Sequence, residues 1–204
     1  MSFSLIDFRE RAARAEVLSH DIIYGDHRLN LDFQDALAGS TLRDAAVLIG
    51  LRPHGDEVRV ILTQRAEQMR KHAGQVAFPG GAIDDDDASH HHAALREAEE
   101  EIGLKPDDVE VIGQLPDYLT GSGFRIKPVL GLVSANVTLT INPDEVAAVF
   151  DVPLSFLMNP ANHQRQSRVW QGIERHYYVI QYEDRMIWGV TAGIVRMLYE
   201  RLYA

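Results

Sequence analysis

The chain has 204 residues, 46% hydrophobic and 25% charged, so it is long enough to bury a substantial core and has the composition of a globular protein. Thirty acidic and twenty basic residues give a net charge of −10, which argues against a broad nucleic-acid-binding or anionic-membrane surface. Cysteine is absent, which excludes disulfides, thiolate metal sites and cysteine nucleophiles.

The N-terminal residues carry no targeting signal of the secretory kind. Asp7, Arg9 and Glu10 stand where a signal peptide requires an apolar stretch. The sequence also has no uncharged apolar run near the roughly 20 residues that a membrane helix needs. We therefore expect a soluble, cytoplasmic protein without a membrane or nucleic-acid partner. The sequence leaves the oligomeric state open, a homodimer included.

The predicted elements mix helices and strands along the whole chain. Hydrophobic periodicity and turn residues predict a helix at 4–18, strands at 44–52, 57–65 and 75–78, a helix from Ser89 to Gly103, strands at 109–115 and 125–133, a short helix at 152–159, strands at 165–170 and 175–182, and a helix at 189–203. Their irregular alternation predicts an α/β fold in which helices pack on the faces of a mixed sheet. We divide the chain into an N-terminal helical extension, 1–40, and a main domain, 41–204.

The helix that ends at Gly103 carries an unusual group of acids. Its apolar face consists of Ala94, Leu95, Ala98 and Ile102. The neighbouring sector consists of Glu97, Glu100 and Glu101, whereas Glu99 points toward solvent. Partial burial of three carboxylates without a counterion raises their pKa values and destabilises the fold. A hard divalent cation such as Mg²⁺ or Mn²⁺ resolves this conflict, although a solvated glutamate run is the alternative for the helix taken alone.

The segment upstream of these glutamates favours the metal site. In "GQVAFPGGAIDDDDASHHHAALREAEEEIGL", a strand ends at Gly80-Gly81 and an acidic loop leads to the helix. This segment resembles the Nudix box of Nudix hydrolases, and residues 96–104 match its second half at every fixed position. The first half differs, because Asp87 stands where the box has glutamate and the loop is one residue longer. The resemblance implies a Nudix-type α/β/α sandwich for 41–204.

A second motif resembles the coenzyme A diphosphatase branch of the same family. The segment "ILTQRAEQMRKHAGQVAFPGG" (61–81) fits the branch pattern, with Ile61 in place of its first leucine. The likeness extends from about residue 44 to the C-terminus. It implies hydrolysis of the coenzyme A diphosphate to 3′,5′-ADP and 4′-phosphopantetheine. A Nudix hydrolase of another nucleoside diphosphate derivative, such as ADP-ribose, and a non-catalytic nucleotide sensor are the alternatives.

The resemblance also implies roles for individual residues. The expected ligands of Mg²⁺ or Mn²⁺, which are also expected to be catalytic, are Glu97, Glu100 and Glu101. Glu145 is the candidate for an additional catalytic acid, and the alternative is that it begins a helix. The expected substrate-binding residues are Arg65, Arg70, Gly80 and Gly81. Each arginine has an alternative role as a partner of a carboxylate or of solvent.

Other motifs have simpler interpretations. Phe78 is expected in the core, with stacking on adenine as the alternative. The three histidines at 90–92 occupy successive helical positions and so cannot chelate one ion together, which favours a solvated helix surface. Residues 120–123 form either a backbone nest for the 3′-phosphate or an ordinary loop.

Overall fold

The computed structural model describes residues 3–17, 23–30, 41–55, 57–69, 72–170 and 172–204. The α-helices are α1 (Leu5–Val17), α3 (His90–Ile102), α4 (Leu154–Leu157) and α5 (Gly189–Leu202). Short 3-10 turns lie at η1 (Asp26–Arg28), η2 (Pro106–Asp108) and η3 (Pro160–Asn162). The strands are β1 (Tyr24–Gly25), β2 (Arg43–His54), β3 (Glu57–Arg65), β4 (Val76–Ala77), β5 (Gly80–Ala82), β6 (Val109–Gln114), β7 (Tyr118–Leu119), β8 (Phe124–Val133), β9 (Val146–Pro153), β10 (Gln164–Trp170), β11 (Ile173–Tyr182) and β12 (Arg185–Trp188).

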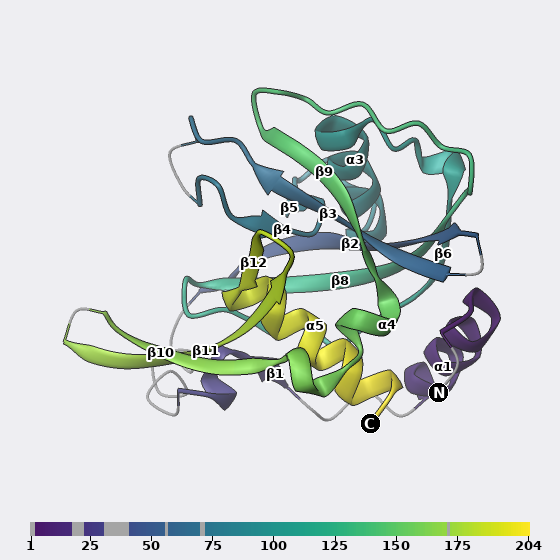
Figure 1. Ribbon diagram of the computed structural model, residues 1–204. Helices are drawn as coiled ribbons and strands as arrows, with labels where there is room; N and C mark the ends of the chain where they lie inside the picture. The colour runs from purple at the N-terminus through teal and green to yellow at the C-terminus, as the bar shows by residue number, and fades with distance from the viewer. Residues whose placement is uncertain (1–2, 18–22, 31–40, 56, 70–71, 171) are drawn as a thin grey trace.

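A mixed sheet forms the centre of the molecule. In the described ranges it has nine strands, with β1-β7-β8-β2-β3-β4 as its main order, while β5, β6 and β9 pair with β2, β8 and β3. Strand β2 runs parallel to β8 and antiparallel to β3 and β5. Strands β10, β11 and β12 form a separate antiparallel sheet. The hairpin of β10 and β11 extends away from the body (Figure 1).

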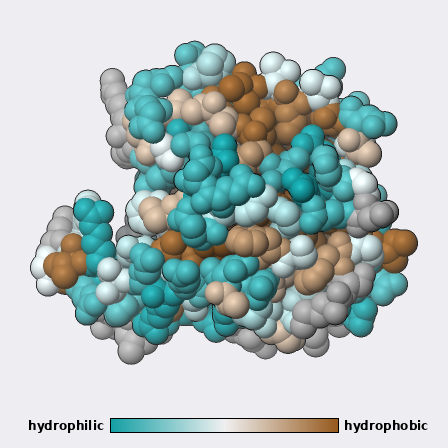
Figure 2. Space-filling view, in the orientation of Figure 1, coloured by the Kyte–Doolittle hydropathy of each residue, from teal (hydrophilic) through white to brown (hydrophobic). Residues whose placement is uncertain are grey.

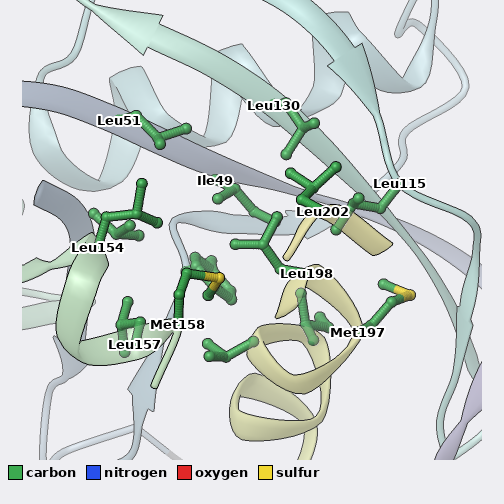
Figure 3. Close-up of a cluster of buried hydrophobic side chains, with 14 of the residues drawn as sticks. Ile49, Leu51, Leu115, Leu130, Leu154, Leu157, Met158, Met197, Leu198 and Leu202 are labelled. Carbon is green, nitrogen blue, oxygen red and sulfur yellow. The ribbon is translucent and has the colours of Figure 1, made fainter. Parts of the chain in front are cut away.

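Helices cover both faces of the central sheet. Figure 1 shows α3 on one side and α5, with α4 and α1, on the other. Successive residues of a strand point to opposite faces, so Leu48 packs with the apolar face of α3 and Ile49 packs with Leu198 of α5. Figure 3 shows Ile49 among the leucines and methionines of the α5 side. The predicted α/β/α sandwich with a mixed sheet is confirmed.

Most predicted elements agree with the structure to within two residues. The helices at 4–18, Ser89–Gly103 and 189–203 correspond to α1, α3 and α5, and the predicted strand at 57–65 is β3. The prediction missed β1, β5, β7, β9 and β12. Four of these have two to four residues, too few for a periodicity to emerge. Strand β9 has eight residues and pairs with β3, a long-range contact that local propensity does not reveal.

The N-terminal segment packs on the rest of the molecule. Phe8 of α1 is fully buried in the cluster that contains Ile49, and β1 pairs with β7. Asn30 bonds to the backbone of β11 in both directions, since its side-chain amide donates to the carbonyl of His176 and its oxygen accepts from the amide of His176. Residues 31–40 lie outside the described ranges, so the boundary at residue 40 stays a prediction.

In the view of Figure 2 hydrophilic residues alternate with hydrophobic areas at the top and across the middle of the body, and a further hydrophobic area lies at the outer end of the β10–β11 hairpin. Val169, Trp170 and Ile173 are exposed there. Over the described part of the chain, every helix is too short or too polar to span a bilayer.

Candidate metal and active site

Helix α3 begins and ends at the residues that the sequence predicts. The Ser89 hydroxyl accepts a hydrogen bond from the amide of His92 at 3.1 Å, which caps the first turn. Gly103 adopts a left-handed conformation, with φ 66°, and its amide donates to the carbonyl of Glu99. These caps fix the ends of the helix, and its apolar face fixes its rotation. As a result, Ala94, Ala98 and Ile102 face the sheet.

The glutamates of α3 differ in their burial. The side chain of Glu101 is 3% exposed, that of Glu97 is 15% exposed, and that of Glu100 is 53% exposed. Glu99 is exposed, as predicted. The structure therefore brings Glu97 and Glu101 together at the edge of the core, while Glu100 lies at the outer side of this pair.

Burial changes the ionisation of the two inner glutamates. Desolvation raises the pKa of Glu101 to about 7, and the neighbouring charges of Glu97 and Glu145 act in the same direction. Burial also raises the pKa of Glu97, although its hydrogen bond with Arg96 opposes the change. The predicted rise in pKa is confirmed for both groups. Metal-free protein thus holds these carboxylates at a cost in stability.

The two glycines upstream of the helix contact the two inner glutamates. The amide of Gly80 donates to Oε2 of Glu101 at 3.2 Å. A Cβ at Gly81 would lie 2.5 Å from Cδ of Glu97, so only glycine leaves room for that carboxylate. Both glycines belong to β5 and pair with β2, whereas the sequence predicts that they end a strand. At Gly80 a Cβ would collide with the carbonyl of Ala46, so the missing side chain permits this pairing.

We expect the substitution Gly81→Ala to weaken Mg²⁺ binding by about tenfold, because the new methyl group displaces the Glu97 carboxylate, an effect worth about 1.4 kcal/mol. Isothermal titration calorimetry measures the affinity. Ala82→Ser is the matched control, since Ala82 lies in the same strand and its side chain is exposed. Equal Mg²⁺ affinity in Gly81→Ala and the control would show that Glu97 does not hold the ion.

Arg96 connects the glutamates to the acidic loop. Its guanidinium donates to both oxygens of Asp87, at 3.1 and 3.0 Å, and to Glu97 and Glu100, at 2.9 and 3.2 Å. The side chain of Asp87 is 1% exposed, and Arg96 holds its pKa well below the usual range. Asp87 therefore anchors Arg96, which in turn orients two of the glutamates. Asp87 stands at the position of a glutamate in the box, which is a sequence signal for this anchoring role. The extra residue in the loop made the match at this position uncertain.

Glu145 lies near enough to the helix glutamates to act on them electrostatically. The residue directly precedes β9, so the alternative that it begins a helix is wrong. Its negative charge raises the pKa values of both Glu97 and Glu101, which places its carboxylate on the same side of the site. The structure thus brings together an acid from the 140–146 segment and the acids of α3.

Backbone hydrogen bonds hold Glu145 in this place. The amides of Thr140 and Asn142 donate to the last carbonyls of α3, those of Ile102 and Glu101, at 2.8 and 2.9 Å. The carbonyl of Glu145 accepts from the amide of Ala66 at 2.8 Å. The 140–146 segment is therefore attached both to α3 and to the loop that follows β3.

The predicted substrate-binding residues have different environments. Nη1 of Arg65 lies 3.6 Å from Oε1 of Glu101, so in this structure Arg65 partners a carboxylate. Its Nε is buried and has no hydrogen-bond partner among the described residues, which leaves a donor in the site. Arg70 lies outside the described residues. Phe78 is buried in the core, and stacking on adenine is excluded by this position.

The histidines and the glycine loop have internal partners. His90 and His91 both contact Oε1 of Gln114, and His92 contacts Asp87 at 2.8 Å. The three rings do not converge on one point, as predicted, and their contacts lie at the exposed helix surface, where His92 keeps 56% of its side chain accessible. The amides of Gly121 and Gly123 donate to Asp26 and Thr120, so the loop interpretation of residues 120–123 replaces the phosphate nest.

The chemistry of the inner acids fits a divalent metal. Glu97 and Glu101 offer only oxygen ligands, their ionised forms are disfavoured without a cation, and Gly81 makes room for the Glu97 carboxylate. Arg96 bonds to Glu97 and Glu100 in the structure. Over the described ranges, no three His, Asp or Glu side chains are already arranged around one ion position.

A family model described as the NUDIX domain matches residues 41–175. Among curated proteins, the chain is 45% identical to an "Uncharacterized Nudix hydrolase NudL" of Citrobacter koseri over 78% of this chain and 84% of that protein. It is 40% identical to the protein of the same description in Klebsiella pneumoniae over 85% of this chain and 95% of that protein.

Solved structures of low sequence identity also match. A Caenorhabditis elegans Ap4A hydrolase binary complex is 18% identical over 56% of this chain and 82% of that chain, with a TM-score of 0.47. A NUDIX hydrolase from Alicyclobacillus acidocaldarius is 20% identical over 60% of this chain and 83% of that chain, with a TM-score of 0.46.

Proposed function

Because the chain belongs to the Nudix family and is a hydrolase of phosphorus-containing anhydrides, we propose that it hydrolyses the diphosphate bond of coenzyme A. The products would be 3′,5′-ADP and 4′-phosphopantetheine. Two features support the proposal: the paired Glu97 and Glu101 carboxylates against the Gly80-Gly81 strand, and the 61–81 motif that resembles the coenzyme A branch. The carboxylate pair supports the assignment as a hydrolase, and the motif supports coenzyme A as the substrate.

Nudix hydrolases generally need divalent metal ions. We propose that Glu97, Glu101 and Glu100 hold Mg²⁺ or Mn²⁺, which supplies charge neutralisation at the diphosphate and lowers the pKa of a bound water. Glu101 must be ionised to bind a cation. Because burial raises the pKa of this carboxyl to about 7, metal binding releases its proton near neutral pH. Arg96 keeps Glu97 and Glu100 in orientation without contacting the substrate.

Two further groups of the chain have proposed roles. Glu145 accepts the proton of the attacking water, because its carboxylate faces Glu97 and Glu101 from a separate segment. Arg65, whose Nε lacks a partner in the described structure, binds a phosphate oxygen of the substrate. Arg70, Gly80 and Gly81 complete the proposed substrate contacts. A cytoplasmic location is part of the proposal and is supported by the cysteine-free sequence.

We expect purified protein with Mg²⁺ or Mn²⁺ to cleave coenzyme A with a kcat/KM at least about tenfold above that for ADP-ribose, a difference of about 1.4 kcal/mol in transition-state binding. Dephospho-coenzyme A and dinucleoside polyphosphates complete the substrate set, and chromatography resolves the products. Dephospho-coenzyme A is the matched control because it lacks only the 3′-phosphate. Preferential cleavage of ADP-ribose would refute the coenzyme A assignment. Tight nucleotide binding without turnover would identify a sensor instead.

A further inference from the structure

Residues of α5 line a cavity of about 120 Å³. Helix α5 lies on the side of the sheet opposite α3 (Figure 1). Elements from four parts of the chain meet at the cavity: β1 and η1, β7, β11 and α5. The side chains that matter for its chemistry are Tyr24, Arg28, Tyr118, Tyr178, Arg196 and Glu200. Gly193 permits the close approach of α5, because a Cβ at that position would collide with the hydroxyl of Tyr118.

The cavity has more positive than negative charge. One carboxylate, that of Glu200, pairs with both arginines: Nη1 of Arg28 lies 2.9 Å from its Oε2, and Nε of Arg196 lies 2.8 Å from its Oε1. Asp26 does not add to this neutralisation by a direct contact, since its oxygens accept from the hydroxyl of Tyr118 and the amide of Gly121, each at 2.8 Å. Although the whole chain has a net charge of −10, the cavity is lined by two arginines and one glutamate, an excess of one positive charge.

The two guanidinium groups are held in position. The Cζ atom of Arg28 lies 4.5 Å from the centre of the Tyr24 ring, and that of Arg196 lies 5.6 Å from the centre of the Tyr178 ring. A guanidinium has five N–H donors, and the ion pair with Glu200 uses only part of each set. Fixed, parallel N–H donors of this kind match the oxygens of a phosphate group.

We propose that this cavity binds a phosphate group, either inorganic phosphate or the phosphate of a nucleoside monophosphate, between Arg28 and Arg196. The small volume favours a small occupant, because 120 Å³ is well below the pockets of about 300 Å³ or more that take a whole drug-sized ligand. Only the phosphate group enters, and the rest of a nucleotide remains outside. The site is separate from the glutamate site and does not depend on the substrate proposed above.

The test titrates full-length, metal-free protein with inorganic phosphate, AMP or acetate by isothermal titration calorimetry. We expect inorganic phosphate to bind, and we expect Arg28→Gln and Arg196→Gln each to weaken its binding at least about tenfold. AMP that binds with the same arginine dependence identifies the nucleotide as a source of the phosphate. AMP binding that survives both substitutions belongs to another site, and phosphate alone is then the ligand. Arg14→Gln, at an exposed arginine of α1, is the matched control and should leave the affinities unchanged.

The substitution Glu200→Gln gives a result of opposite sign. It removes the carboxylate that neutralises the arginines, so phosphate binding should strengthen by about tenfold, whereas a purely structural role of Glu200 predicts no gain. This variant also keeps the proposal testable if the arginine variants do not fold, which circular dichroism checks. The proposal is overturned if phosphate does not bind, if acetate binds as tightly as phosphate, or if Glu200→Gln gains no affinity.

Discussion

Glu101→Gln is expected to make the metal-free protein more stable while it lowers kcat by about 100-fold or more, the scale of a lost catalytic carboxylate. Folding raises the pKa of Glu101 from 4.5 to about 7, and a rise of this size corresponds to a stability cost of about 3 kcal/mol once the group is ionised. Glutamine removes the buried charge and retains an oxygen that can accept from the Gly80 amide. The gain at pH 8 should therefore reach up to about 3 kcal/mol, less the loss of the Arg65 contact.

The pH dependence has a definite sign. Because the folded pKa of Glu101 is the higher one, the folded state binds the proton more tightly than the unfolded state. Its contribution to stability is therefore complete below pH 4.5 and is lost as the pH rises through about 7. Urea unfolding of metal-free protein at a series of pH values should show this loss in the native sequence and not in Glu101→Gln.

Glu99→Gln is the matched control for this experiment, because Glu99 lies on the same helix with an exposed side chain. It should change the free energy of unfolding by no more than about 0.5 kcal/mol and leave kcat intact. If Glu101→Gln were destabilising at pH 8, the description of Glu101 as a buried, strained carboxylate would be wrong. Unchanged turnover would remove Glu101 from the catalytic site.

Arg96→Gln should have the opposite effect on stability. It leaves Asp87, whose side chain is 1% exposed, without the guanidinium that pairs with both of its oxygens. Breaking a buried ion pair from one side costs about 3 kcal/mol, and the bonds that His92 and the Asp84 amide make to Asp87 do not replace the lost charge. Glu97 and Glu100 also lose their common donor, so metal affinity should fall as well.

The measurement is again urea unfolding, at pH 7 and at acidic pH. Arg96 lowers the pKa of Asp87 below its ordinary value of 3.8, so the pairing stabilises the protein above that pH and the effect is lost as the pH falls through the lower, folded-state pKa. The difference between Arg96→Gln and the native sequence should shrink accordingly. Arg14→Gln, which removes an exposed i,i+4 ion pair, should cost no more than about 0.5 kcal/mol. An equal cost for both variants would show that Asp87 does not depend on Arg96.

The acidic helix is the part of the site that the sequence predicts best. Ser89 and Gly103 fix its ends, and its apolar face fixes its rotation, so the inner position of Glu101 follows from local chemistry alone. The partners of this helix could not be predicted in the same way. Glu145 reaches the site through the pairing of β9 with β3, which joins residues 81 (Arg65 and Val146) to 94 (Arg59 and Pro153) positions apart in sequence.

Asp87 and Gly81 show a second limit of sequence reasoning. The acidic run at 84–87 contains four identical residues, and although the box position singles out Asp87, its burial and its pairing with Arg96 appear only in the folded loop. Gly81, a predicted substrate contact, also makes room for the Glu97 carboxylate, a role that the sequence does not predict. In both cases the function of the residue depends on the space around it, which one-dimensional periodicity does not contain.

The backbone attachment of the 140–146 segment has a consequence for how such a site can change. Thr140, Asn142 and Glu145 are joined to α3 and to the loop after β3 by main-chain amides and carbonyls. Any residue except proline supplies those groups, so these hydrogen bonds do not depend on the side chains at the bonded positions. The side chains around this attachment can therefore change while the main chain keeps Glu145 tied to α3.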